Sequence, residues 1–202
     1  MKNKLLIIGA GGHARSCLEI INLENKYEVY GFFDNNKKKF KSCKFLGSDR
    51  DIHKFKKVCV NLFLCLGTIE NIPFKWLIYQ RAKKLKFKFP KIISPLSFVS
   101  KNTSIGEGTI IMNHSFINSN VKIGKNSIIN NKALLEHDVQ VGNNTHISTG
   151  AIVNGGVKIG DNVFVGSGAI IKENVVIKYG SIIGMGSIVL KNVNSGIFYN
   201  KI

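Results

Sequence analysis

Aliphatic residues recur at every sixth position through the second half of the chain. From Val99 to Val189, all sixteen positions of this register hold valine, isoleucine or leucine, and no insertion interrupts them. Four residues after each of them comes a small or short branched residue, such as Thr109, Ala133 or Val139. Neither the 3.6-residue period of a helix nor the two-residue period of a strand produces this register.

A unit of six residues accommodates one short strand and one corner. Three units close a triangular coil, with the aliphatic residue pointing inward, the small residue near the corner, and Gly or Asn supplying the corner conformations. Stacked coils then hydrogen-bond along the prism at about 4.8 Å. The register therefore predicts a parallel β-helix of hexapeptide repeats over residues 93–202, roughly five coils long.

Strand and helix patterns alternate in the first half of the chain. The strand in KLLIIGAGGHA leads into a glycine-rich turn, and ARSCLEIINL follows with helical spacing. EVYGFFDNN and VCVNLFLCLG are typical of a second and a third strand, and a helix begins at Pro73 in IPFKWLIYQRAKKL. This alternation predicts a small Rossmann-like α/β domain over residues 1–92, ahead of the β-helix.

The glycine-rich turn partly matches a dinucleotide fingerprint. Gly9-x-Gly11-x-x-Ala14 lies between a strand and a helix, where bare backbone amides hold phosphate. Asp34 closes the second strand, about where a ribose-binding acid would lie. Nicotinamide binding normally uses two mononucleotide halves and this domain has one, so we expect a nucleotide diphosphate or nucleotide sugar rather than NAD. His13 in the turn either contacts this ligand or only caps the helix.

The imidazole of His137, flanked by two carboxylates, differs from the residues usual in the repeat. Strand alternation after Leu135 points His137 outward, between the small residues Ser119 and Gly155 of the neighbouring coils. A neutral histidine beside a carboxylate suits a general base. Glu136 and Asp138 both flank it, and the sequence alone does not choose between them. The alternative is a surface histidine at a subunit contact.

The remaining histidines of the repeat do not support a metal site. His114, His137 and His146 fall on different faces of the coil, so we expect no metal within one chain. A covalent intermediate on a cysteine is also not expected in the repeat, because the four cysteines all lie in the N-terminal half. They show no CxxC spacing and indicate reduced cytosolic thiols.

The chain is strongly basic, with 29 Lys and Arg against 12 Asp and Glu and a net charge of +17. Of these, 20 basic and 7 acidic residues fall within residues 1–98. The lysines are scattered or in short runs without aromatic stacking motifs, which favours a solvated surface that attracts small polyanions over nucleic acid binding. No apolar run is long enough to span a membrane and no signal peptide is expected, so we expect a cytoplasmic protein.

Several motifs together make the whole chain resemble the sialic acid O-acetyltransferase-like family of bacterial sugar acetyltransferases. These are GAGGHA at 9–14, FFDN at 32–35, CLG at 65–67 and LLEHDVQVGNNTHISTGAIVNGGVKIG at 134–160. The subgroup that it most resembles N-acetylates UDP-4-amino-sugars in bacillosamine biosynthesis. The resemblance implies left-handed coiling and a homotrimer.

The resemblance also assigns roles to residues. It implies that His137 is the catalytic base, that Asp138 is its supporting acid, and that His146 contacts acetyl-CoA. Further contacts along the cofactor are implied for Gly155, Ser167 and Met185, and contacts to the nucleotide sugar for Gly11, Gly12, His13, Asp34 and Asn35. Two departures from the family pattern are Thr68, where an asparagine or aspartate is usual, and the C-terminal segment SGIFYNKI. Thr68 is expected to affect selectivity for the sugar or the base.

The function expected from these features is acetyl-CoA-dependent N-acetylation of a nucleotide-linked 4-amino-4,6-dideoxy sugar for surface glycan or glycoprotein biosynthesis. Transfer would be direct, with His137 as the base and a backbone N–H near Gly155 as donor to the oxyanion. One alternative is O-acetylation of sialic acid or another surface sugar. Another is a non-catalytic sensor that binds a nucleotide sugar or NAD.

Overall fold

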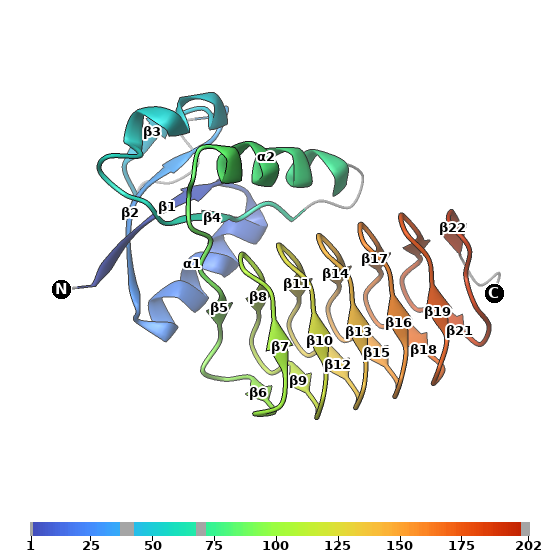
Figure 1. Cartoon of the computed structure of the whole chain (residues 1–202). Coiled ribbons are helices and arrows are strands. Elements are labelled where there is room, and N and C mark those ends of the chain that lie inside the picture. Colours follow the sequence, from blue (N-terminus) through green and yellow to red (C-terminus); the bar gives the residue numbers. More distant parts are fainter. Residues whose placement is uncertain (1, 37–42, 68–71, 199–202) are drawn as a thin grey trace. The chain divides into compact units, whose positions relative to one another are not determined.

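The structure is a computed structural model that describes residues 2–36, 43–67 and 72–198. The chain divides into two compact units, Met1–Ile92 and Ile93–Ile202 (Figure 1). Neither described helix is long and apolar enough to cross a membrane.

The first unit is a four-stranded parallel sheet with a helix on each face (Figure 1). The strand order is β3-β2-β1-β4. The strands are β1 (Asn3–Ile8), β2 (Tyr27–Phe33), β3 (Phe45–Gly47) and β4 (Leu62–Leu64). The helices are α1 (Gly12–Glu24), α2 (Ile72–Lys84) and the 3-10 helix η1 (Asp49–Phe55).

Alternation along β1 divides its side chains between the two faces of the sheet. Leu6 and Ile8 pack in one core with Ile52 of η1 and with Ile78 and Tyr79 of α2. On α1, the buried residues recur with helical spacing and include Cys17 and Ile21 of the predicted face, whereas Leu23 is exposed. The buried residues of α1 are Ala14, Cys17, Ile20 and Ile21.

Two local elements of the first unit differ from the prediction. The third predicted strand shortens to Leu62–Leu64, because Val58 and Val60 are exposed and only the following residues enter the core. The segment before it forms β3 and η1, which the hydrophobic pattern does not indicate. A capping box starts η1, in which the Ser48 hydroxyl accepts from the Arg50 N–H and Asp51 accepts from the Ser48 N–H.

The second unit is a three-sided prism of two-residue parallel strands, stacked coil upon coil (Figure 1). The seven-stranded sheet contains β5 (Ile92–Ile93), β8 (Ile110–Ile111), β11 (Ile128–Ile129), β14 (His146–Ile147), β17 (Phe164–Val165), β20 (Ile182–Ile183) and β22 (Ile197–Phe198). The six-stranded sheet contains β6 (Phe98–Val99), β9 (Phe116–Ile117), β12 (Leu134–Leu135), β15 (Ile152–Val153), β18 (Ile170–Ile171) and β21 (Ile188–Val189). The five-stranded sheet contains β7 (Ser104–Ile105), β10 (Lys122–Ile123), β13 (Gln140–Val141), β16 (Lys158–Ile159) and β19 (Val176–Ile177).

The interior of the prism holds the predicted six-residue register. Strands pair with a shift of eighteen residues, as in Leu134 with Ile152 and Leu135 with Val153. The second residue of each strand points inward, and Leu135, Ile147 and Val153 are all completely buried. The small residue four positions later closes the corner, as Val139 does at 0% exposure.

Asparagines and glycines occupy the corners where the backbone takes a positive φ. One line of corners carries a ladder of Asn126 and Asn144, which are buried, and Asn162, which is partly exposed, with φ between 52° and 57°. The Asn126 side-chain amide donates to Asn144 Oδ1 at 2.9 Å, and that of Asn144 donates to Asn162 Oδ1 at 2.7 Å. The corners therefore stack with the same register as the strands.

We expect the Ile147→Ala substitution to lower the free energy of unfolding by about 2–5 kcal/mol, because it leaves a cavity in a core that has no exposed side. Ile147→Val should cost only about 0.5–1.5 kcal/mol. Thermal or urea unfolding followed by circular dichroism checks this. Gln140→Ala, on an exposed position of the same coil, is the control and should leave the transition unchanged.

Candidate active site

His137 lies at the corner between β12 and β13 and points out of the prism. Leu135 and Val139, two residues to either side of it, are buried inside the coil. Strand alternation alone would place residue 137 on the same side as these two, and the turn at the corner directs the imidazole outward instead. The side chain of His137 is 64% exposed. The next residue, Asp138, has φ 63° and forms the turn of the corner.

A hydrogen-bond relay holds the imidazole. His137 Nδ1 donates to Asp138 Oδ2 at 2.8 Å, and the side-chain amide of Asn120, one coil earlier, donates to Asp138 Oδ1 at 2.6 Å. These two bonds hold the pKa of Asp138 below its ordinary value, so its carboxylate stays charged. The Glu136 carboxylate turns away and accepts from Asn118 at 2.7 Å. Of the two flanking acids, only Asp138 contacts His137.

Gly155 lies directly against the imidazole, one coil further along the prism. A Cβ atom on Gly155 would come within 2.7 Å of both Cε1 and Nε2 of His137. The absence of a side chain at this position therefore makes the room that the imidazole occupies. The cavity beside it has a volume of about 510 Å³. Its lining residues are Glu136, His137, Asp138, Asn154, Gly155, Gly156, Glu173 and Asn174.

This arrangement suits proton abstraction. With Nδ1–H donated to a carboxylate, the neutral imidazole leaves Nε2 as an acceptor on the side of Gly155 and the cavity. The N–H of Gly156 donates to the His137 carbonyl at 2.9 Å. Within the described part of the chain no acceptor contacts the N–H of Gly155, so this group can serve a ligand.

His146 does not lie beside His137 in one chain. It is the outward residue of β14 in the seven-stranded sheet, whereas His137 lies at the junction of the other two sheets. His146 is buried, its Nε2 lies 3.2 Å from the Asn130 amide, and its ring packs edge-on against Phe164 at 5.2 Å. Among the described residues, no group of three or more His, Cys, Asp or Glu side chains is placed to hold a metal ion.

Ser167 and Met185 lie on a different line of corners from His137. Both occupy corners between the seven-stranded and six-stranded sheets, at the opposite edge of the six-stranded sheet. The Ser167 hydroxyl is hydrogen-bonded to that of Ser148 at 3.0 Å, and Met185 is 81% exposed. The predicted cofactor contacts therefore lie on both sides of the six-stranded sheet. Gly155 is in the same line of corners as His137, and Ser167 and Met185 are in the opposite line.

The glycine turn of the first unit is braced by Asp34. Its Oδ2 accepts from the Ala10 N–H at 2.8 Å and its Oδ1 from the Asn36 N–H at 2.9 Å, which ties the end of β2 to the turn. Gly11 is the N-cap of α1, with Gly12 as the first helical residue. His13 packs over Gly67, where a Cβ atom would come within 2.8 Å of the imidazole side chain. Thr68 lies outside the described residues.

A cavity of about 310 Å³ opens beside this turn, between the sheet and α2. Asp34 and Asn35, two of the residues expected to contact the nucleotide sugar, line it. Its other lining residues are Ile8, Gly9, Phe33, Asn36, Asp49, Leu66, Phe74 and Ile78. Gly11, Gly12 and His13 do not line it.

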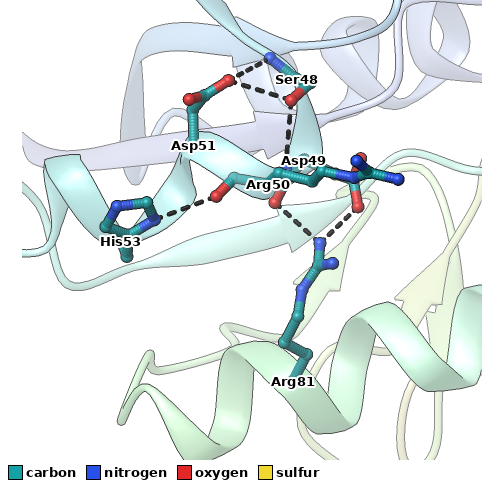
Figure 2. Close-up of polar contacts among 6 residues, drawn as sticks. All are labelled: Ser48, Asp49, Arg50, Asp51, His53 and Arg81. Carbon is teal, nitrogen blue, oxygen red and sulfur yellow. Dashed lines mark hydrogen bonds and ion pairs between the residues drawn. The ribbon is translucent and has the colours of Figure 1, made fainter.

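The ion pair between Asp49 and Arg81, at the rim of this cavity, is not predicted from the sequence. Figure 2 shows the Arg81 guanidinium of α2 meeting both the carboxylate and the backbone carbonyl of Asp49 in η1. The bond from Arg81 Nη2 to the Asp49 carbonyl is 2.7 Å. The S-D-R-D run at 48–51 is the local signal that points to η1, because Ser48 and Asp51 form a capping box. The pairing with Arg81, 32 residues away, has no signal in the sequence.

Comparisons with known proteins agree with both units. Residues 4–72 match the PglD N-terminal domain, and residues 102–137 and 138–173 match the bacterial transferase hexapeptide family of six repeats. The chain is 31% identical over 114 residues to UDP-N-acetylbacillosamine N-acetyltransferase of Bacillus subtilis (strain 168). That alignment covers 55% of this chain and 52% of the relative, so the chain spans about half the length of the curated relative that it matches.

Two solved structures are similar over nearly the whole chain. PerB from Caulobacter crescentus, in complex with CoA and GDP-perosamine, is 26% identical with a TM-score of 0.90, covering 96% of this chain and 91% of that one. The acetyltransferase domain of PglB from Neisseria gonorrhoeae, in complex with acetyl coenzyme A, is 25% identical with a TM-score of 0.88, covering 96% and 93%. These likenesses confirm the predicted fold, a small Rossmann-like domain followed by a left-handed parallel β-helix. The chain therefore joins a unit that matches the PglD N-terminal domain to a hexapeptide-repeat prism, and the proteins it is similar to include a UDP-N-acetylbacillosamine N-acetyltransferase and an acetyltransferase domain.

Proposed function

We propose that this protein transfers the acetyl group of acetyl-CoA directly to the amine of a nucleotide-linked 4-amino-4,6-dideoxy sugar, for surface glycan or glycoprotein biosynthesis. The observation that carries the proposal is the relay from Asn120 through Asp138 to His137, which opens onto a cavity next to Gly155. The names of the similar proteins support the reaction class. The four free thiols support a cytoplasmic location.

His137 acts as the general base in this proposal. The neutral sugar amine attacks the thioester carbonyl carbon, and Nε2 of His137 takes the proton that the amine loses. The N–H of Gly155 is the candidate donor to the tetrahedral oxyanion. The intermediate then expels the CoA thiolate, which receives the proton from the imidazolium, and the products are the N-acetyl sugar and CoA thiol. Asp138 stabilises the imidazolium and keeps Nε2 free of hydrogen before the attack.

The outward surface of the six-stranded sheet indicates how a second copy completes the site. Its outward residues are all apolar, whereas the five-stranded sheet presents mostly polar ones. We call this surface the apolar face, and its residues are Phe98, Phe116, Leu134, Ile152, Ile170 and Ile188. Phe98 is 53% exposed and stacks on Phe116 with the ring centroids 4.6 Å apart. A continuous exposed stripe of this kind marks a protein contact.

The apolar face separates the two sets of predicted site residues. His137 and Gly155 lie in the line of corners on one side of this face, and Ser167 and Met185 lie in the line of corners on its other side. Contact through this face brings the line of corners with His137 in one copy toward the line of corners with Ser167 and Met185 in the next copy. Three copies close a ring through such a head-to-tail contact. The proposal therefore includes a homotrimer in which acetyl-CoA lies between two protomers.

The experiment that tests the proposed function is an assay for release of the CoA thiol. Acetyl-CoA is incubated with UDP-, GDP- and dTDP-linked 4-amino-4,6-dideoxy sugars, and separately with sialic acid. We expect thiol release with a nucleotide-linked amino sugar and none with sialic acid. Release with sialic acid alone would favour O-acetylation, and binding of a nucleotide sugar without any release would favour a sensor.

Substitutions along the relay should produce a graded loss of kcat. His137→Ala removes the base, and we expect a fall of about 10²–10⁴-fold with the protein still folded. Asp138→Asn should cost less, because the imidazole remains but loses its charged partner. Asn120→Gly should cost least, since it removes only the support of Asp138 and keeps a residue that tolerates φ 60°. An unchanged kcat in His137→Ala would remove this residue from the mechanism.

A charge on the apolar face should separate the protomers and abolish transfer. Leu134→Lys places an ammonium in the centre of this face, and we expect monomers in sedimentation equilibrium and no thiol release. Gln140→Lys, on the neighbouring sheet of the same coil, is the matched control and should stay trimeric and active. Full activity of a monomeric Leu134→Lys protein would contradict a site shared between copies.

A further inference from the structure

The cavity beside the glycine turn continues into a second hollow between η1 and α2. The second hollow has a volume of about 370 Å³ and is lined by Asn35, Ser48, Asp49, Arg50, Phe74 and Arg81. It shares Asn35, Asp49 and Phe74 with the first. Phe74 is 44% exposed and presents an aromatic ring at the junction of the two hollows. An aromatic ring above an apolar floor suits the flat face of a nucleobase.

Asp49 is held in place at this junction. Arg81 binds its Oδ2 and its backbone carbonyl, and the capping of η1 by Ser48 fixes the turn that carries it (Figure 2). Its side chain is 21% exposed. In the described ranges no donor contacts Asp49 Oδ1, so this oxygen is available to a ligand. The Asp49 carboxylate and the Arg81 guanidinium therefore lie side by side at this junction, and Arg50 also lines the second hollow.

These two groups distinguish the bases of the common sugar nucleotides. A carboxylate only accepts hydrogen bonds and a guanidinium only donates them. The pairing edge of guanine offers, in order, the O6 acceptor, the N1–H donor and the N2 amino donor. Uracil and thymine offer an acceptor, one donor and a second acceptor, and that second acceptor would face the carboxylate. Adenine and cytosine place a ring-nitrogen acceptor at the centre of this edge, where the carboxylate also repels it.

We propose that the junction lined by Asp49, Phe74 and Arg81 is a base-reading site that selects guanine, so that the sugar substrate is GDP-linked. Oδ1 of Asp49 accepts from the N2 amino group, Oδ2, which also binds Arg81, accepts from N1–H, Arg81 donates to O6, and Phe74 stacks on the ring. This inference rests on the proposed function, since it takes a nucleotide sugar as the substrate. The comparisons leave the base open, because the Bacillus subtilis relative is named for a UDP-linked sugar and PerB is bound to a GDP-linked one.

Equilibrium binding of GDP, IDP and UDP to the full chain tests the assignment. IDP differs from GDP only in lacking the N2 amino group, so it isolates the bond that uracil nucleotides cannot make. We expect GDP to bind about tenfold or more tightly than IDP, because a hydrogen bond to a charged group is lost, and UDP to bind more weakly than IDP. UDP binding as tightly as GDP, or IDP binding as tightly as GDP, would overturn the assignment.

Two variants test which residues determine the selectivity for the nucleobase. Asp49→Asn should weaken GDP about tenfold or more and IDP less, which compresses the ratio of their dissociation constants. Phe74→Leu should weaken all three nucleotides alike, because stacking does not depend on the pattern of donors. Glu28→Gln is the control, because Glu28 lines a separate cavity of the first unit together with Lys2 and Tyr27, and this change should affect none of the three. An unchanged GDP-to-IDP ratio in Asp49→Asn would overturn the role of this residue.

The thiol-release assay separates failure of this inference from failure of the proposed function. Transfer to a UDP-linked amino sugar in preference to a GDP-linked one would overturn the guanine assignment and leave the acetyltransferase proposal standing. Absence of transfer to any nucleotide-linked sugar, together with absence of nucleotide binding, would contradict both.

Discussion

Burial of one aliphatic side chain in every hexapeptide determines where the other side chains of the second unit point. Each coil encloses only a narrow interior, so the inward residues cannot be exchanged for the outward ones without exposing the core. Leu135 and Val139 enter this interior on either side of the corner, and His137 between them has no place except outside. The exposure of the proposed base is thus a consequence of core packing and of the corner turn at Asp138.

The surroundings of the base come from neighbouring coils rather than from its own. Asn120, one coil before, donates to Asp138, and Gly155, one coil after, leaves the space for the imidazole. A repeat with identical coils would place three similar residues in this line. The line instead holds Ser119, His137 and Gly155, so the function depends on differences between units that the packing of the core leaves unconstrained. The same holds for the apolar face, whose residues contribute nothing to the interior.

Much of this could be predicted because the relevant interactions are local or strictly periodic. The inward register follows from spacing alone, and the outward direction of His137 follows from its place at the corner between two inward residues. The choice between Glu136 and Asp138 does not, since it depends on the positive φ of Asp138 and on which asparagine lies one coil earlier. Asp49 and Arg81 were missed because their contact joins two elements 32 residues apart, one of which the hydrophobic pattern does not indicate. Tertiary pairing of charged side chains leaves no periodic trace in the chain.

Because the coils stack without interruption, positions along the prism axis are spaced at a fixed interval. Each coil adds about 4.8 Å along the axis, and no loop between strands can stretch or shorten that step. In the proposed function, an extended thioester arm laid along the corner beside the imidazole would pass Gly155 one coil further on and Glu173 two coils further on. Positions along such an arm would therefore be spaced in steps of one coil, and moving a site residue by one step without changing its side of the prism requires insertion or deletion of eighteen residues.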